Sequence, residues 1–253
     1  MVSSIIEINH AFYINLESRP DRRKHVESQL KLIGIKAERF NAVKLENGAL
    51  GCSMSHLKCL QIAKENNWDH VLICEDDVTF TNPELFVLQF NKFLKNEKNW
   101  DVVLIAGNNM PPYTQVRDYC VKVTRCQTTT GYLVKSHYFD TLIDNIKMGM
   151  SLLIKNKDKH VTFAIDKYWF LLQERDLWFL IVPLSVVQRE DYSDIEKRRT
   201  NYAGVMVDLD KKALFERVKL VENTKVENTK VENTMNGFKH VRDNVSFKKI
   251  QFH

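Results

Sequence analysis

Short apolar runs alternate with amphipathic segments along the first 190 residues. The runs are rich in β-branched and aromatic residues and stop at polar or turn-forming residues, which is typical of buried strands. They lie at residues 11–16, 35–40, 68–78, 100–106, 131–134 and 178–187. Helical spacing of apolar positions predicts helices at residues 21–33, 53–66, 83–93, 137–146 and 161–170. This alternation predicts an α/β fold with a mostly parallel central sheet flanked by helices.

Three stretches fall outside this pattern. Residues 108–127 are irregular around Pro111 and Pro112, so we expect a surface loop with short strands of a size that commonly covers a site. We predict one folded domain over residues 1–205 and a C-terminal extension over residues 206–253. Residues 221–234 read VENTKVENTKVENT, a five-residue repeat that fits neither heptads nor solenoids and predicts a linker or a solvated helix. The basic end of the extension predicts packing back onto the domain or homo-oligomer formation.

Composition narrows the function classes. The chain has 253 residues and 44% hydrophobic residues, enough for a buried core. Its net charge of +5 suits an anionic small molecule such as a nucleotide diphosphate and is too small to indicate nucleic-acid binding. No apolar run is long enough for a membrane span and no positively charged leader is present, so we expect a cytoplasmic protein. The five cysteines contain no C-x-x-C pair, and we expect neither a disulfide framework nor a structural zinc site.

An acidic triplet, Glu75-Asp76-Asp77, follows the apolar run at residues 68–78. Ligands of open α/β sheets collect at the carboxyl ends of strands, and carboxylates hold hard divalent cations. Such a cation neutralises a leaving diphosphate. Alternation along an extended chain predicts that Glu75 and Asp77 face one cleft while Asp76 points away. The alternative is that the triplet is only a solvated turn or helix cap.

Several common catalytic motifs are missing from the sequence. It contains no G-x-x-x-x-G-K-[ST], no G-x-G-x-x-G after a strand, no G-x-S-x-G and no H-E-x-x-H. These absences argue against P-loop NTPases, dinucleotide-dependent dehydrogenases and the main hydrolase classes.

Three ordered blocks resemble glycosyltransferase family 25, which contains bacterial lipooligosaccharide biosynthesis glycosyltransferases and procollagen hydroxylysine galactosyltransferases. The blocks are FYINLESRPDRR at Phe12 to Arg23, GALGCSMSHLKCL at Gly48 to Leu60 and VLICEDDVTF at Val71 to Phe80. Weaker matches follow in order at residues 100–107, 128–134 and 164–170. The resemblance implies a GT-A type, Rossmann-like fold that binds a UDP-sugar with Mn²⁺ or Mg²⁺.

The resemblance also implies a metal site. Asp77 would be the direct ligand, with Glu75 near the ribose or a metal-bound water. A histidine commonly supplies the last ligand, but the corresponding stretch here, VVQREDYSDIE, contains none. Gln188 or Asp194 is then the candidate, or water fills the position.

The predicted donor-binding residues match the family blocks. They are Asn15, Arg19, Ser55, His56, Glu75, Asp76, Thr130 and Gly131. Arg22, Arg23 and Thr129 are further candidates. For the arginines a solvated helix face is the alternative, for His56 a structural role, and for the threonines a turn.

The implied reaction is inverting transfer of a hexose, galactose or glucose, to an acceptor hydroxyl on collagen-type hydroxylysine or a glycan. Asp166 is the predicted general base, and its alternative role is a helix N-terminal carboxylate favoured by the helix dipole. Two rival functions remain: a catalytically inactive scaffold that binds nucleotide and metal, and a metal-dependent phosphoesterase that uses the acidic triplet.

Overall fold

The computed structural model describes residues 2–156, 158–193, 198–212 and 215–216. The chain divides into one compact unit, Met1–Asp210, and a second unit, Lys211–His253. The repeat at residues 221–234, the candidate ligand Asp194 and most of the predicted extension lie outside the described residues. The domain boundary at residue 205 therefore stays a prediction, and the fold below is that of the first unit.

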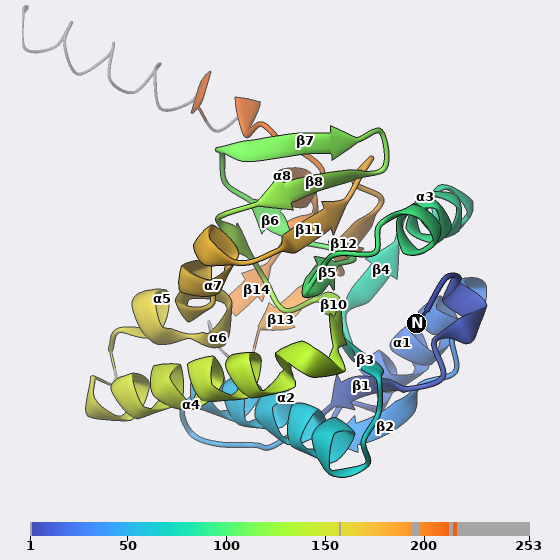
Figure 1. Ribbon diagram of the computed structural model, residues 1–253. Helices are drawn as coiled ribbons and strands as arrows, with labels where there is room; N and C mark the ends of the chain where they lie inside the picture. The colour runs from blue at the N-terminus through green and yellow to red at the C-terminus, as the bar shows by residue number, and fades with distance from the viewer. Residues whose placement is uncertain (1, 157, 194–197, 213–214, 217–253) are drawn as a thin grey trace, which may run out of the picture. The chain divides into compact units, whose positions relative to one another are not determined.

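An eight-stranded sheet forms the centre of the first unit (Figure 1). Its order is β2 (Glu38–Asn41), β1 (Ala11–Asn15), β3 (His70–Glu75), β10 (Gly131–Lys135), β5 (Val102–Leu104), β11 (Trp178–Ile181), β8 (Cys120–Val123) and β7 (Tyr113–Arg117). Strand pairing shows that β10 and β8 run opposite to the other six. The predicted α/β class with a mostly parallel sheet is therefore confirmed.

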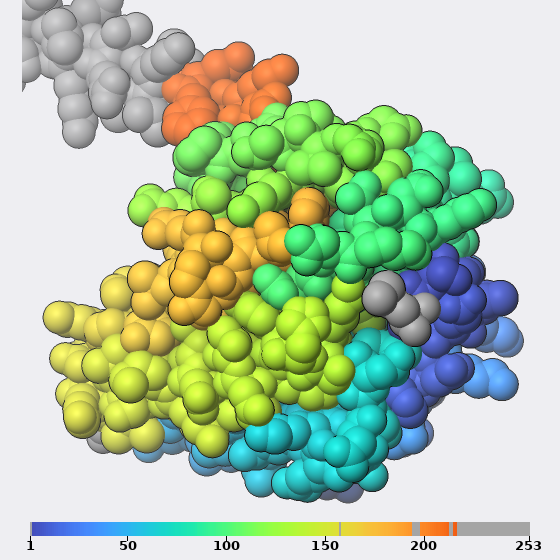
Figure 2. Space-filling model, in the orientation of Figure 1, coloured from blue at the N-terminus to red at the C-terminus, as the bar shows by residue number. Residues whose placement is uncertain are grey.

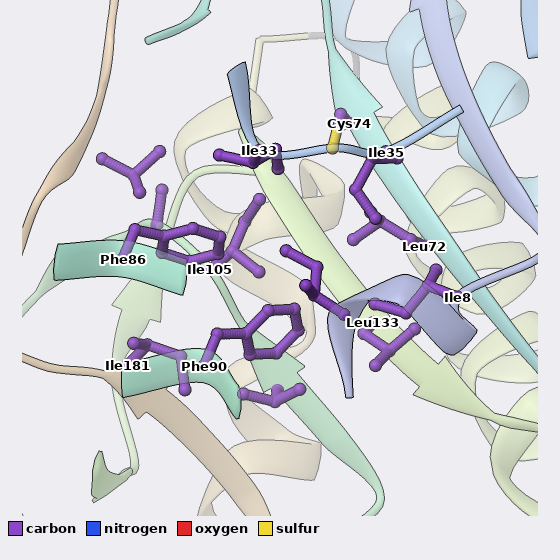
Figure 3. Close-up of a cluster of buried hydrophobic side chains, with 14 of the residues drawn as sticks. Ile8, Ile33, Ile35, Leu72, Cys74, Phe86, Phe90, Ile105, Leu133 and Ile181 are labelled. Carbon is purple, nitrogen blue, oxygen red and sulfur yellow. The ribbon is translucent and has the colours of Figure 1, made fainter. Parts of the chain in front are cut away.

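Helices cover both faces of this sheet. The long helices are α1 (Pro20–Leu32), α2 (Gly48–Glu65), α3 (Pro83–Asn96) and α4 (Phe139–Lys155). Helices α1 and α3 pack on one face, where Leu72 and Cys74 of β3 point (Figure 3). Helices α2 and α4 lie side by side on the other face, where their cyan and yellow-green surfaces adjoin (Figure 2). Val71 and Ile73 of β3 point toward this face. Strand alternation thus divides the apolar residues between two cores.

Shorter elements complete the unit. They are β4 (Val78–Phe80), β6 (Asn108–Asn109), β9 (Cys126–Gln127), β12 (Val186–Gln188), β13 (Asp191–Ser193), β14 (Arg198–Thr200), α5 (His160–Phe163), α6 (Ile165–Tyr168), α7 (Phe170–Arg175), α8 (Ala203–Met206) and the 3₁₀ turns η1 (Ile5–Glu7) and η2 (Ser136–Tyr138). Strand β4 pairs with β12, β6 with β9, and β13 with β14.

The structure corrects several predicted elements. The irregular stretch 108–127 is more than a loop, because its strands β7 and β8 extend the central sheet. Helix α2 begins at Gly48, earlier than predicted, because the Asn47 side chain accepts the Leu50 N–H and caps it. The predicted helix at 161–170 is three short helices, interrupted between the first two by Ala164 in an extended conformation. The predicted strand at 178–187 is split, and its second part, β12, leaves the central sheet.

Gly51 of α2 lets the chain after β2 pack closely against this helix. A Cβ at Gly51 would lie 2.5 Å from the Val43 carbonyl oxygen and 3.3 Å from the Leu45 nitrogen. The Val43 N–H donates to Ser55 Oγ (2.9 Å), and the Ser55 hydroxyl donates to the Gly51 carbonyl (2.8 Å). Helix α2 therefore fixes residues 43–45 through one small residue and one hydroxyl.

We predict that Gly51→Ala lowers the free energy of unfolding by about 1–3 kcal/mol, because backbone atoms must move to admit the methyl group. Gly204→Ala in α8 is the matched control, since a Cβ at Gly204 would have no neighbouring atom within 4 Å, and alanine favours a helix over glycine. Urea denaturation of both variants measures the effect. An unchanged midpoint for Gly51→Ala would contradict the close packing.

Candidate functional site

A cavity of about 790 Å³ lies at the carboxyl ends of β1, β2 and β3. Its wall also includes the first half of α2, residues 127–129, the α5–α6 segment and residues 188–202 in part. Nine predicted site residues line it, two of which, Arg22 and Thr129, were further candidates; the others are Arg19, Ser55, Glu75, Asp76, Asp77, Asp166 and Gln188. The fold therefore brings together side chains from several separate segments of the chain.

Asp76 is the anchored member of the acidic triplet. Its two oxygens accept from Asn15 Nδ2 at 2.7 Å and from Arg22 Nη1 at 3.0 Å. Burial raises the pKa of Asp76, while Arg22 and Asn15 act in the opposite direction. Arg22 also pairs with Asp191 at 3.1 Å, and so connects the end of β3 to β13. These contacts indicate that Asp76 holds the turn after β3 in place.

Asp77 is partly buried, and one of its carboxylate oxygens is buried without a partner among the described residues. Its Oδ1 has no hydrogen-bond partner within the described part of the chain, and its Oδ2 faces Gln188 Nε2 at 3.4 Å. Pairing of β12 with β4 sets Gln188 opposite Val78 and therefore beside Asp77. Burial, followed by the charges of Glu75 and Asp76, raises the pKa of Asp77 well above its ordinary value. An unpartnered buried carboxylate oxygen is costly, and a bound cation would offset that cost.

Glu75 has the opposite environment. Its Oε1 accepts from the Thr129 hydroxyl at 2.7 Å and lies 3.4 Å from both His56 Nε2 and Cys52 Sγ. Burial acts to raise the pKa of Glu75, but the hydrogen bonds of His56, Thr129 and Cys52 hold it below its ordinary value. Glu75 is therefore stabilised in its ionised form by hydrogen bonds, whereas one oxygen of the neighbouring Asp77 has no such partner among the described residues.

These two carboxylates fit a hard divalent cation. Asp77 offers a buried oxygen with no partner in the described residues, and Glu75 offers a second carboxylate on the same cavity wall. The Gln188 amide would supply a carbonyl oxygen after rotation of its end group, whose orientation is assigned from hydrogen bonding. Oxygen ligands of this kind suit Mg²⁺ and Mn²⁺.

Asp166 lies across the cavity in the first turn of α6. Its Oδ2 accepts the backbone N–H of Thr128 at 3.1 Å. Burial is the main cause that raises the pKa of Asp166, and the charge of Glu75 adds to it. A carboxylate with a raised pKa beside a cavity is suited to accept a proton.

The predicted basic residues are largely neutralised. Arg19 pairs with Asp21 (3.0 Å) and Asp191 (2.7 Å), and Arg23 pairs with Glu27 on the exposed side of α1. Lys44 and Arg189 also line the cavity, and neither forms a salt bridge within residues 2–156, 158–193 and 198–212.

Four predicted donor-binding residues do not line the cavity. Asn15 and His56 lie behind its wall and contact Asp76 and Glu75. Thr130 is fully buried and donates to the Thr128 hydroxyl (3.1 Å), while a Cβ at Gly131 would lie 2.6 Å from the Ile105 side chain. Thr128 and Cys52 also line the cavity and were not among the predicted site residues. The spacing of Cys52 and His56, one helical turn, is the signal that could have linked the cysteine to Glu75.

Comparison with known proteins covers two of the three sequence blocks, Gly48 to Leu60 and Val71 to Phe80. The family model described as glycosyltransferase family 25 (LPS biosynthesis protein) matches residues 43–152. This match confirms the resemblance to glycosyltransferase family 25. The segment contains the acidic triplet and most of the helix α2 wall, and it ends before Asp166 and Gln188.

Two curated relatives carry related names. A "Putative glycosyltransferase" of Haemophilus influenzae is 24% identical over 178 residues, covering 54% of this chain and 62% of that protein. A "Glycosyltransferase 25 family member" of Drosophila pseudoobscura pseudoobscura is 28% identical over 103 residues, covering 30% of this chain and 16% of that protein. The chain therefore matches less than two thirds of the length of each relative.

Solved structures with low overall similarity include transferases. A mannose-1-phosphate geranyltransferase of Thermus thermophilus has a TM-score of 0.41 at 8% identity and covers 68% of this chain and 73% of its own. A Drosophila β-1,4-galactosyltransferase 7 mutant, in complex with manganese, UDP-Gal and xylobiose, has a TM-score of 0.31 at 16% identity and covers 53% and 51%. Among the described residues, no helix has the length and apolar character to cross a membrane.

We predict that Asp77→Asn raises the free energy of unfolding of the metal-free protein at neutral pH by about 1–3 kcal/mol, the usual cost of a buried polar group without a partner. The native pKa of Asp77 is raised above the unfolded value. The native state therefore binds this proton more tightly, so the contribution of Asp77 to stability is fully present below about pH 4 and is lost as the pH rises through the raised pKa. Asparagine has no such ionisation.

Thermal melts with excess chelator between about pH 4 and pH 8 would measure this difference. Asp118→Asn is the control, because Asp118 is 70% exposed and lies outside the cavity wall. Melting curves of wild type and Asp77→Asn that change in parallel with pH would contradict the assignment.

Proposed function

We propose that this chain is a metal-dependent inverting glycosyltransferase that moves a hexose, galactose or glucose, from a UDP-sugar to an acceptor hydroxyl. The observation that carries the proposal is the buried, unpartnered oxygen of Asp77 beside Glu75 at the strand end. The match to glycosyltransferase family 25 supports glycosyl transfer as the reaction class.

Asp77, Glu75 and Gln188 would hold Mn²⁺ or Mg²⁺. The ion, when bound, supplies positive charge that stabilises the diphosphate of the departing UDP. Asp76 does not act as a ligand in this proposal, because Asn15 and Arg22 already occupy both of its oxygens. Its part is to fix the turn from which Asp77 projects.

The cavity suits a nucleotide sugar in size and charge. Ligand pockets commonly have volumes of about 300–1,000 Å³, and this cavity has about 790 Å³. Lys44 and Arg189 are basic groups of the wall available to phosphate, and Arg19 adds a charge shared with Asp21 and Asp191. In this proposal Asn15, His56, Thr130 and Gly131 support the wall from behind, and Ser55 holds residues 43–45.

Asp166 is the proposed general base. The acceptor oxygen forms its bond to the anomeric carbon as the bond to UDP breaks and UDP leaves with the electron pair. The hydroxyl proton passes to the Asp166 carboxylate. The raised pKa of Asp166 makes it a stronger base than an ordinary aspartate, and the Thr128 N–H fixes one of its oxygens.

The acceptor is a glycan or a collagen-like peptide that carries hydroxylysine. We expect residues 108–126 and 148–159 to select it. The first segment includes β7 and β8 and the second includes the end of α4, so selection would rest on the connections between these elements. Homo-oligomer formation through the C-terminal extension and a cytoplasmic location stay predictions.

We predict that Asp77→Asn lowers the transfer rate about 100-fold or more, because several kcal/mol of charge stabilisation depend on the cation. UDP release would be measured with Mn²⁺ from UDP-galactose, UDP-glucose and UDP-N-acetylglucosamine, using hydroxylysine and simple saccharides as acceptors. Asp118→Asn should retain wild-type turnover. Normal turnover of Asp77→Asn would remove the central assignment, and acceptor-independent release of phosphate or sugar phosphate would favour a phosphoesterase.

We predict that Asp166→Asn lowers kcat about 100- to 10,000-fold, the usual contribution of a general base. The Kd of UDP in the presence of Mn²⁺ should change by less than about threefold, which corresponds to less than ~1 kcal/mol of binding free energy. Calorimetry for binding and a rate profile against pH separate the two effects. Asp140→Asn is the control, because this carboxylate is 69% exposed near the start of α4. Equal kcat for wild type and Asp166→Asn would indicate another base, and UDP binding without acceptor-stimulated release in wild type would indicate a binding scaffold.

A further inference from the structure

Cys52, His56 and Glu75 form a second cluster of metal-binding groups beside the acidic triplet. Cys52 and His56 are one turn apart on α2, and Glu75 ends β3. Their ligand atoms all lie within 4.8 Å of one another. Within the described residues, this is the one group of three or more His, Cys, Asp or Glu side chains close enough to hold a metal ion. The cluster shares Glu75 with the proposed Mn²⁺ or Mg²⁺ site but is built from softer ligands.

The spacing fits a tetrahedral zinc site. Zinc bonds of about 2.3 Å to sulfur and 2.0–2.2 Å to nitrogen or oxygen place tetrahedral ligand atoms about 3.4–3.6 Å apart. Glu75 Oε1 lies 3.4 Å from Cys52 Sγ and 3.4 Å from His56 Nε2. Two of the three edges of the ligand triangle therefore already have the required length.

A partner for the other ring nitrogen of His56 completes the arrangement. His56 Nδ1 lies 3.0 Å from the Tyr132 hydroxyl, and both side chains are fully buried. With the ion bound, His56 would carry its proton on Nδ1 and donate it to Tyr132, so that Nε2, which faces Glu75, would give its lone pair to the ion. Metal-binding histidines usually have such a second hydrogen bond, which fixes the tautomer and the ring orientation.

The cluster opens to the cavity. Cys52 and Glu75 line the cavity wall, so an ion can enter from that side. The Thr129 hydroxyl, 3.9 Å from Cys52 Sγ and 2.7 Å from Glu75 Oε1, or a water from the cavity would take the fourth position. An open fourth position next to a ligand cavity differs from a closed structural zinc site.

We propose that Cys52, His56 and Glu75 bind one thiophilic divalent cation, Zn²⁺, at a site separate from the Asp77 site. On binding, the Cys52 thiol releases its proton to solvent and the thiolate, the His56 imidazole and the Glu75 carboxylate bond to the ion. The ion takes Glu75 from the neighbouring site, so Zn²⁺ inhibits hexose transfer. This last consequence alone rests on the proposed function.

The test uses the full chain freed of metal with a chelator. Co²⁺ is titrated as a spectroscopic substitute for Zn²⁺, and Zn²⁺ affinity is measured by competition with a fluorescent indicator. Wild type should show thiolate-to-cobalt charge-transfer absorption that saturates at one equivalent and disappears when Zn²⁺ is added. Absence of this absorption in wild type would overturn the proposal.

Variants assign the ligands. Cys52→Ser should lose the absorption and bind Zn²⁺ at least ~100-fold more weakly. Removing a hydrogen-bond partner of a ligand already lowers metal affinity about 10- to 100-fold, and loss of the ligand itself should cost at least as much. Tyr132→Phe should weaken binding about 10- to 100-fold. Cys59→Ala, on the same helix but in the apolar core, is the matched control and should retain both signals. Cobalt absorption that persists in Cys52→Ser would assign the thiolate elsewhere and overturn the site.

A measurement on wild type guards against variants that do not fold. Zn²⁺ should slow alkylation of Cys52 by iodoacetamide, as mapped by mass spectrometry, and unchanged alkylation would contradict the proposal. Asp77→Asn should retain cobalt absorption even though it is expected to lose transfer. This variant distinguishes failure of the zinc site from failure of the proposed glycosyl transfer.

Discussion

Burial of Asp76 and partial burial of its neighbours Glu75 and Asp77 at the end of β3 are the constraint on which the rest of the site depends. The three carboxylates differ in the contacts that stabilise them. Asp76 is neutralised by Arg22 and Asn15, Glu75 is hydrogen-bonded by Thr129 and its neighbours, and Asp77 keeps an oxygen without a partner in the described residues. Polar contacts of the protein thus stabilise two of the acids, while the third, Asp77, lacks among the described residues a hydrogen bond that a bound ligand could replace.

The sequence predicted the location of this site because the relevant signals are local. An apolar strand that runs into acids identifies the carboxyl end of a strand, and the general rule for open sheets places ligands there. The sheet class followed from the same alternation of runs. Asp76 was predicted to point away from the cleft, but it lines the same cavity as Glu75 and Asp77, because residues 76 and 77 form a turn and not an extended chain.

Long-range pairing determines what the sequence could not predict. Strand β10 enters the sheet antiparallel between β3 and β5, and β7 and β8 join its far edge. No local pattern encodes those partners. Burial of His56, Thr130 and Gly131 behind the wall depends in the same way on β10 beside β3. The family resemblance identified these residues through their motifs, but motifs do not distinguish a residue that touches a ligand from one that supports its neighbour.

The short pairing of β4 with β12 joins two parts of the chain that are more than 100 residues apart. It brings Gln188 to Asp77, while Asp166 also comes from the later part of the chain. A nascent chain that has emerged only as far as α4 would already contain the acidic turn but neither of these side chains. Completion of the candidate site is therefore a late event in biosynthesis, because it waits for strand β12 and helix α6 to emerge.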